Sequence, residues 1–380
     1  PLLILTLDND TAGISAADEL SAQFMALGFE HSKPILPKWY EDANQSLKLH
    51  TSDFRALLSD LAKTEQKQEA AMQKKTENQP KLPEKAKASN VNNNLDFFFT
   101  GTCNDNPIST GFSNLDDLLD GGLREGLYII GAGSALGKTT FCLQLANRAA
   151  ASGQSVAFLS LEQSRQELIA KTLSMLTYAD PSNGGQEVCT AREVKRYALL
   201  PPGNKKALNN AKEKLTEYGN NLFIYEIDDQ DQSVSELVLS HELETGSAPA
   251  VLIIDYLQIM KPSRIGITSD KQIIDANVHE LRQLARRHKI PIIAISSLNR
   301  IAYDQGLSFK SFKESGGIEY SSDLLLGLQP KGSRQDSTMD DFLRNDSREM
   351  ELVLLKNRNG STGKCQFMFK AKYNFFKEMQ

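Results

Sequence analysis

Ala132-Gly-Ser-Ala-Leu-Gly137-Lys138-Thr139-Thr140 is the stretch that decides the fold of this chain. It follows an apolar run over residues 127–130 and opens a helix-like run that ends near Ala151. A glycine-containing turn between a strand and a helix is typical of a phosphate-binding loop. Glycines let backbone N–H groups turn inward, and the start of the helix adds unpaired donors. The pattern therefore predicts an ATP site lined by Ala132, Gly133, Ser134, Ala135, Leu136, Gly137, Lys138, Thr139 and Thr140.

Two side chains of this loop have predicted roles. Lys138 should reach the β- and γ-phosphates, and the Thr139 hydroxyl should hold Mg²⁺. Ala132 stands where the motif normally has its first glycine, but Gly131 and Gly133 flank it. A chance Gly-Lys-Thr at a turn is the alternative, and the acidic residues that follow along the chain argue against it.

Polar residues end the later apolar runs. Asp255 follows the run 251–254 and is predicted to support Mg²⁺, while Glu162 follows the run 158–161 and could deprotonate the attacking water. Ligands of open α/β sheets lie beyond the carboxyl ends of the strands, so both carboxylates are candidates for the site. Ser296 and Ser297 end a third run. The structural alternatives are a turn cap for Asp255, a helix N-terminal acid for Glu162 and ordinary strand-end serines.

Apolar runs alternate with helix-like runs from about residue 106 onward. Strands are predicted over 126–130, 155–160, 222–225, 251–254, 291–296, 324–328, 351–356 and 365–370. Helices are predicted over 138–151, from about 165, over 233–244 and over 275–288. This alternation is typical of an α/β fold with a mostly parallel, twisted sheet, so residues 106–380 are predicted to form one such domain.

The N-terminal part of the chain differs in composition. Residues 1–60 contain one strand-like run (2–7) and two helix-like runs (15–27 and 53–61). Residues 63–94 are mainly Lys, Glu, Gln and Asn, with almost nothing to bury, so residues 61–105 are predicted to be a flexible linker.

Charge and cysteine content restrict the functional class. The net charge of −5 gives no strong basic field, although local lysines and backbone amides can still bind a nucleic-acid strand. The four cysteines form no CxxC pair and are predicted to be free thiols in a reducing compartment, which suggests the cytoplasm. The apolar runs are too short to span a bilayer, so no membrane association is expected.

From about residue 107 to its end, the chain resembles the C-terminal ATPase domain of DnaB-type replicative helicases. Several blocks carry the resemblance in order: 108–117 with 121–123, the loop 132–140, Ser160-Leu-Glu162, 254–258, 297–300, 314–319, 356–360 and Thr362-Gly363. Each block alone is a weak signal, but jointly they are specific. The resemblance implies a RecA-like P-loop ATPase core that binds ATP and Mg²⁺, forms a homo-oligomer, expected to be a hexameric ring, and draws single-stranded DNA through its centre.

The resemblance also implies roles for individual residues. Glu162 would be the catalytic glutamate, and Lys356 and Arg358 would be fingers that reach the ATP of a neighbouring subunit. The predicted DNA-facing loop contains Lys313, Glu314 and Gly316. Ser297 departs from the family, which usually has Gln there, and this puts the coupling of hydrolysis to movement in doubt.

The N-terminal zone resembles a different family, the Toprim domains of primases and topoisomerases. Leu7-Asp8-Asn9-Asp10-Thr11-Ala12-Gly13 looks like the acidic motif of that family, and Asp42-Ala43-Asn44 fits a later feature. Asp8 and Asp10 lie two residues apart at a strand end, so they point the same way and could share Mg²⁺. The family's upstream Glu is missing, so we expect a fragment with half of such a domain and no priming activity. An acidic turn that caps a helix is the alternative.

A small partial Toprim-like α/β segment, a linker and a DnaB-like motor together suggest part of a phage- or mobile-element-type primase–helicase. Two other classes stay open: a RecA- or RadA-like recombination ATPase, and a non-motor ATP-binding loader or regulator of a helicase. Asn359 before Gly360 favours the helicase over the recombinase.

Overall fold

The computed structural model describes residues 106–379 except 184–186, 228–232, 261–268, 300–305, 313–314 and 333–338, together with the backbone of two short N-terminal strands. The chain divides into two compact units, Pro1–Cys103 and Asn104–Gln380. In the first unit, β1 (Leu3–Ile4) pairs in parallel with β2 (His31–Ser32). Asp8, Asp10 and Asp42 lie outside the described residues, as does the whole predicted linker 61–105.

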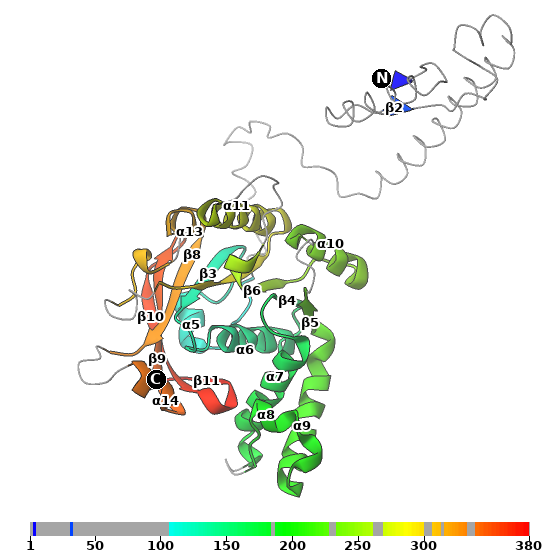
Figure 1. Ribbon diagram of the computed structural model, residues 1–380, viewed down its shortest axis with the longest axis vertical. Helices are drawn as coiled ribbons and strands as arrows, with labels where there is room; N and C mark the ends of the chain where they lie inside the picture. The colour runs from blue at the N-terminus through cyan, green and yellow to red at the C-terminus, as the bar shows by residue number, and fades with distance from the viewer. Residues whose placement is uncertain are drawn as a thin grey trace, which may run out of the picture. The chain divides into compact units, whose positions relative to one another are not determined.

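The second unit is built on a nine-stranded sheet with the order β11-β10-β9-β8-β3-β7-β6-β4-β5 (Figure 1). The strands from β5 to β8 in this order are parallel, whereas β9, β10 and β11 each run antiparallel to the strand before them. Their bounds are β3 Gly126–Ala132, β4 Val156–Ser160, β5 Leu222–Glu226, β6 Val251–Asp255, β7 Pro291–Ser297, β8 Leu324–Pro330, β9 Ser347–Asn357, β10 Gly363–Lys370 and β11 Phe375–Glu378. The predicted α/β fold with a mostly parallel sheet is confirmed.

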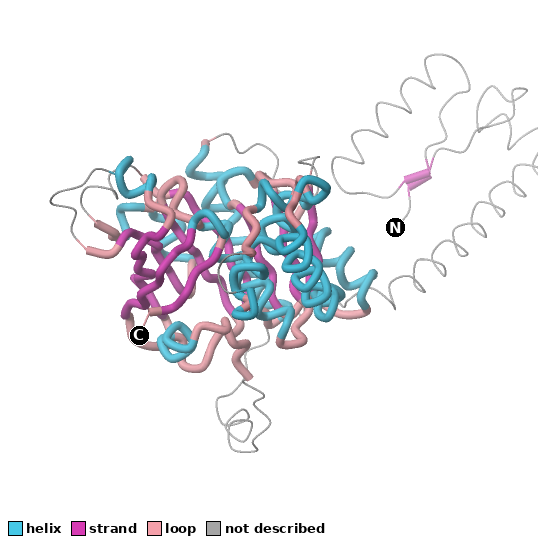
Figure 2. The backbone as a smooth tube through the Cα atoms, turned by 90° about the horizontal axis from the view of Figure 1, so that it is seen from below, coloured by secondary structure: helices cyan, strands magenta, loops and turns pink. Residues whose placement is uncertain are grey.

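Both faces of this sheet are covered, because its central strands carry apolar side chains at nearly every position. Along β3, Tyr128 and Ile130 pack into one core while Leu127 and Ile129 pack into the other, as the alternation of a strand requires. The first core contains side chains of α6 (Lys138–Ala151), and the second contains side chains of α10 (Val234–Thr245) and α11 (Asp270–His288). Figure 1 shows α11 and α6 on opposite sides of the sheet, and Figure 2 shows the strands as one layer between helices.

The helices begin where their sequences supply capping groups. α7 (Arg165–Ala179) begins with a reciprocal capping box between Ser164 and Glu167, and α10 begins with another between Ser233 and Glu236. α10 ends at Gly246, whose φ of 82° suits glycine. The remaining helices are α5 Ser113–Leu118, α8 Ala191–Val194, α9 Pro202–Tyr218, α13 Ser315–Ser321 and α14 Met339–Arg344.

The prediction missed α9, β11 and the short helices α5, α8, α13 and α14, while α6 begins and ends at the predicted residues. Among the described residues, no helix combines the length and the apolar character that crossing a membrane would need.

Candidate active site

The loop between β3 and α6 has a conformation fixed by close packing. Gly137 has φ 88°, and a Cβ there would lie 2.9 Å from the rings of Phe369 and Phe376, so only glycine fits without displacement. Gly131 is equally constrained, because a Cβ would lie 2.4 Å from the Phe312 ring. Ala132 is the last residue of β3, fully buried and outside the positive-φ region, so no glycine is needed there. The departure from the usual motif therefore does not distort the loop.

Lys138 and Thr139, the first two residues of α6, point to the carboxyl edge of the sheet. The Lys138 ammonium donates to the carbonyl oxygens of Ala132 at 2.9 Å and Gly133 at 3.3 Å. The Thr139 hydroxyl donates to Oδ2 of Asp255 at 2.7 Å. The structure thus brings together the residues predicted to hold phosphates and Mg²⁺, and their oxygens are the ligands that Mg²⁺ prefers.

Asp255 and Glu162 lie at the ends of neighbouring strands. Ser160 of β4 pairs with Asp255 of β6, and the Leu161 N–H donates to the Asp255 carbonyl at 2.8 Å, so Glu162 follows directly beside it. Burial raises the pKa of Asp255, the Thr139 hydrogen bond opposes that rise, and the charge of Glu162 adds to it. The two acids therefore share one electrostatic environment.

Ser297 ends β7 and pairs with Ala132 of β3, which places the predicted serines next to the loop. Gln258, three residues after the end of β6 at Asp255, contacts both serines. Its amide Nε2 donates to the Ser296 hydroxyl at 2.8 Å, and its Oε1 accepts from the Ser297 N–H at 3.3 Å. Gln258 carried no predicted role by itself, because a contact between segments 38 residues apart leaves no local pattern.

Arg348 is a second contact that the sequence did not reveal. It lies at the start of β9, and its Nη1 donates to the Ala135 carbonyl of the phosphate-binding loop at 3.0 Å. Burial lowers the pKa of this guanidinium. The antiparallel part of the sheet is thereby connected to the loop between β3 and α6.

Lys356 and Arg358, the predicted fingers, lie at the other end of β9. Eight residues separate Lys356 from Arg348, which is about 25 Å of strand. Lys356 Nζ donates to the carbonyls of Glu319 and, at 2.7 Å, of Ser322, and burial lowers its pKa. Arg358 donates to the Tyr320 carbonyl at 2.6 Å. The structure therefore does not bring the two fingers to the phosphate-binding loop of the same chain.

Of the predicted DNA-facing loop, Lys313 and Glu314 lie outside the described residues. Gly316 lies in α13, and a Cβ on it would meet no atom within 4 Å. Gly317, by contrast, is pressed against the Asp275 carboxylate of α11. The start of α13 is thus anchored to α11 on one side and open at Gly316.

Comparisons with known proteins identify the family of this fold. The model of the DnaB-like helicase C terminal domain matches residues 107–378. The replicative DNA helicase DnaB of Geobacillus stearothermophilus is 30% identical over 281 residues, which cover 72% of this chain and 57% of that protein. The replicative DNA helicase DnaC of Bacillus subtilis (strain 168) is 29% identical over 278 residues, with the same two coverages. The chain thus spans little more than half the length of these curated relatives.

A solved structure of a DnaB-like replicative helicase and its interactions with primase has the same fold. It superposes with a TM-score of 0.63 at 20% identity, and the superposition covers 87% of this chain and 80% of that one. The family match covers the nine-stranded sheet and every candidate ATP-site residue from Ala132 to Arg358. This chain therefore belongs to the family of DnaB-like helicase C-terminal domains.

Proposed function

We propose that this chain binds ATP with Mg²⁺, hydrolyses it, and is the motor part of a replicative DNA helicase. The observation that carries the proposal is the 2.7 Å hydrogen bond from the Thr139 hydroxyl to the buried Asp255 carboxylate, beside Lys138 at the start of α6. The family membership and the curated relatives named above support it.

Each residue of the site has a defined task in this proposal. Backbone N–H groups of the loop 133–138 hold the β- and γ-phosphates, and Lys138 turns from the Ala132 and Gly133 carbonyls to the phosphate oxygens. Thr139 and Asp255 hold Mg²⁺, which neutralises charge on the phosphates when it is bound. A carboxylate oxygen of Glu162 accepts the proton of the attacking water.

Lys356 and Arg358 act on the ATP of a neighbouring copy. The length of β9 supports this proposal, because Lys356 lies about 25 Å from Arg348, the residue that contacts the phosphate-binding loop of the same chain. A finger that stabilises charge on the transferred phosphoryl group contributes about 10³- to 10⁵-fold in rate. Hydrolysis would then require an assembled homo-oligomer, which we propose to be a hexameric ring.

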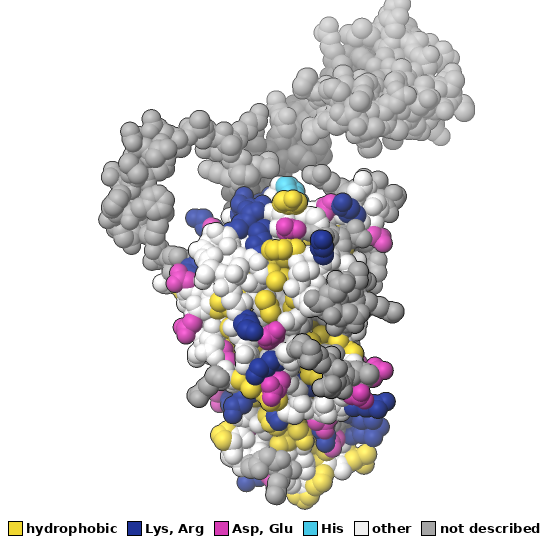
Figure 3. Space-filling view, turned by 90° about the vertical axis from the view of Figure 1, so that its left-hand side faces the viewer, with side chains coloured by type: hydrophobic (Ala, Val, Ile, Leu, Met, Phe, Trp, Pro, Cys, Tyr) yellow, Lys and Arg dark blue, Asp and Glu magenta, His cyan; other side chains and the backbone are white. Residues whose placement is uncertain are grey.

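Single-stranded DNA is the proposed track of this ring. Lys313, Glu314 and Gly316 are proposed to face it, and the open side of Gly316 leaves room for a backbone approach. Figure 3 shows basic, acidic and apolar side chains interspersed on one face of the chain. With a net charge of −5, contact with DNA would depend on local basic groups and backbone amides.

More specifically, we propose that the protein is a primase–helicase and that it acts in the cytoplasm. In this proposal the chain consists of a partial Toprim-like domain (1–60), a linker (61–105) and the ATPase domain (106–380). Asp8 and Asp10 are the proposed Mg²⁺ ligands of the first domain. The acidic motif from Leu7 to Gly13 supports the Toprim assignment. The parallel pairing of β1 with β2 fits it as well, because parallel strands need a crossover connection.

The decisive experiment measures ATP hydrolysis with and without oligothymidylate, together with displacement of a labelled strand from a forked duplex. We expect DNA-stimulated hydrolysis and strand displacement. Lys138→Ala should lower the turnover by about 10²-fold or more, because an electrostatic stabiliser of the transferred phosphoryl group is lost. Lys206→Ala, an exposed lysine of α9, should change neither.

Three outcomes would redirect the proposal. Undiminished turnover in the Lys138→Ala protein would refute the ATP site. Hydrolysis without strand displacement would favour a loader or regulator, and strand pairing without displacement would favour a recombination ATPase.

A further inference from the structure

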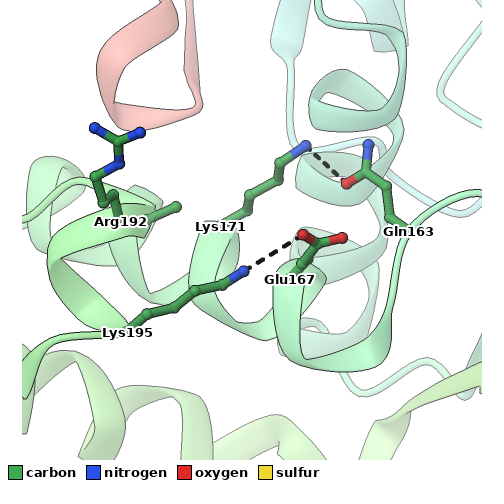
Figure 4. A pocket seen from close by; sticks show the side chains of 6 residues that line it. Gln163, Glu167, Lys171, Arg192 and Lys195 are labelled. Atoms are coloured by element: carbon green, nitrogen blue, oxygen red, sulfur yellow. Dashed lines mark hydrogen bonds and ion pairs between the residues drawn. The ribbon is translucent and has the colours of Figure 1, made fainter.

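A pocket of about 450 Å³ lies between the start of α7 and the short helix α8. Its lining contains three basic side chains and one acidic one (Figure 4): Gln163, Glu167, Lys171, Ala191, Arg192 and Lys195. α7 supplies Lys171 and Glu167, whereas Arg192 and Lys195 come from α8 and its C-terminal end. None of these residues had a role in the ATP site.

Lys171 is the half-buried member of this set. Burial lowers the pKa of its ammonium, which is the expected effect of withdrawing a cation from water. Among the described residues its hydrogen-bond partner is the Gln163 amide oxygen, at 2.8 Å. An ammonium has three donors, so this neutral acceptor leaves most of its capacity for a further acceptor in the pocket.

The single carboxylate of the pocket lining, Glu167, already has partners. Glu167 Oε1 pairs with Lys195 at 3.4 Å, and Oε2 accepts from the Ser164 N–H as part of the capping box. Lys195 also opposes the charge of Lys171 by like-charge repulsion. The pocket lining itself carries three cations against one carboxylate, and this local excess of positive charge favours an anion.

The lining indicates the kind of anion. The two uncharged members are Gln163 and Ala191, so the lining offers no aromatic ring on which a nucleobase could stack. The volume accommodates an oxyanion with some of its water. The pocket also adjoins the proposed ATP site: Gln163 directly follows Glu162, and the carboxylates of Asp255 and Glu162 both act on Lys171.

We propose that Lys171, Arg192 and Lys195 form a binding site for inorganic phosphate, which takes up the anion released when ATP is cleaved. This inference rests on the proposed ATPase function for the source of the phosphate. The site itself is a property of the free protein and can be tested without turnover. The phosphate of a DNA backbone has the same chemistry and is the competing source.

The test uses the full chain carrying Lys138→Ala, which weakens phosphate binding at the loop between β3 and α6. Inorganic phosphate is titrated in and followed by ³¹P line broadening and calorimetry. Adding Arg192→Gln and Lys195→Gln should weaken binding by at least about tenfold, equivalent to about 1.4 kcal/mol. Adding Arg196→Gln instead, an exposed arginine just outside the pocket, should leave binding unchanged. Equal phosphate binding by all three proteins would overturn the proposal.

Two further measurements distinguish inorganic phosphate from the DNA backbone as the ligand, and the phosphate site from the proposed ATPase function. If the Arg192→Gln/Lys195→Gln change abolished oligothymidylate binding while phosphate binding was absent throughout, the site would belong to DNA and the proposal would be wrong. Turnover is measured in parallel on the unsubstituted chain. Absence of ATP hydrolysis there would refute the proposed function, whereas the pocket is judged by phosphate binding alone.

Discussion

Asp255, a proposed Mg²⁺ ligand, is a deeply buried carboxylate. Its side chain is 1% exposed, and burial is the main cause of its raised pKa. One neutral donor, the Thr139 hydroxyl at 2.7 Å, offsets part of that penalty. A charged carboxylate in such a place destabilises the nucleotide-free fold at neutral pH, because its ionised form is better solvated in the unfolded chain.

Replacing Asp255 with Asn should therefore stabilise the nucleotide-free protein while it abolishes hydrolysis. The amide is nearly isosteric and can still accept the Thr139 hydrogen bond through its oxygen, but it carries no charge to desolvate. We expect the midpoint of thermal unfolding at pH 7 to rise by a few degrees, and turnover to fall by about 10²-fold or more.

Asp341→Asn, at an exposed acid of α14, is the matched control and should change neither quantity. A lower unfolding midpoint for Asp255→Asn would show that the carboxylate stabilises the fold.

At the residue scale, the site residues that belong to local sequence motifs could be predicted. Lys138 and Thr139 begin the helix that follows β3, Asp255 ends β6, and the parallel sheet brings the carboxyl ends of its strands together. Gln258 and Arg348 could not be predicted, because each reaches the site across a long sequence separation. Lys171 left a faint signal, since it lies four residues after Glu167 on one helix face, but this spacing is common on solvated helices.

At the scale of elements, α10 is fastened to the edge of the sheet through one buried histidine. The ring of His241 lies 3.0 Å from the Tyr225 hydroxyl through Nδ1 and 3.1 Å from the Ser155 hydroxyl through Nε2. It also meets the Phe223 ring edge-on, with centroids 4.7 Å apart. Burial lowers the pKa of His241, and the nearby Glu244 and Glu242 only partly oppose this.

The lowered pKa of His241 predicts a loss of stability in acid. The unfolded histidine takes up its proton near pH 6.5, before the folded one does, so stability is full above that pH and falls as the pH drops below it. One proton accounts for a slope of at most about 1.4 kcal/mol per pH unit. The unfolding free energy should therefore depend less on pH, between about 7.5 and 5.5, in His241→Gln than in the unsubstituted protein.

His279→Gln, at an exposed position of α11, should keep the original slope. The slope is the informative quantity, since His241→Gln also removes packing. Identical slopes in all three proteins would contradict the assignment.

Elements were predicted where their apolar pattern is strong. β6 has a fully buried VLIID sequence, and α6 follows a motif that specifies a helix, so both were found. α9 was missed because its 17 residues are mostly polar and only Ala207, Leu208, Ala211 and Tyr218 are buried. β11 has four residues and is stabilised by pairing with β10 and by the Gln144 side chain, contacts that a local pattern cannot contain.

At the scale of the whole molecule, the two ends of β9 carry residues of two different proposed roles. Its first residues support the phosphate-binding loop through Arg348, and its last residues present Lys356 and Arg358 away from it. Asp323 holds Arg358 in this position at 3.7 Å and also pairs with Arg282 at 3.5 Å. A finger released toward a neighbouring copy would thus leave Asp323 with a partner.

Mixing two inactive variants tests whether the fingers act between copies. Arg358→Ala chains retain Glu162, and Glu162→Gln chains retain Arg358, so a mixed interface can contain one intact pair. We expect the mixture to regain part of the DNA-stimulated hydrolysis that each variant alone lacks. The matched control mixes Glu162→Gln with Lys138→Ala chains. Every ATP site then lacks either Glu162 or Lys138 in the subunit that binds the nucleotide, so this mixture should stay inactive. Failure of the first mixture, with subunit exchange demonstrated by labelled chains, would place Arg358 in its own site.

The last prediction concerns the division of the chain into Pro1–Cys103 and Asn104–Gln380. Both hydrophobic cores of the second unit lie within residues 108–376, so its folding free energy has its source inside that unit. A chain that lacks residues 1–95 should therefore unfold at the same midpoint as the sheet of the full chain and should keep its DNA-stimulated ATP hydrolysis. The measurement is a thermal unfolding curve beside a turnover assay for both chains. Loss of turnover with an unchanged midpoint would mean that residues 1–95 contribute to contacts between copies, because the fingers act only across such contacts in the proposed assembly.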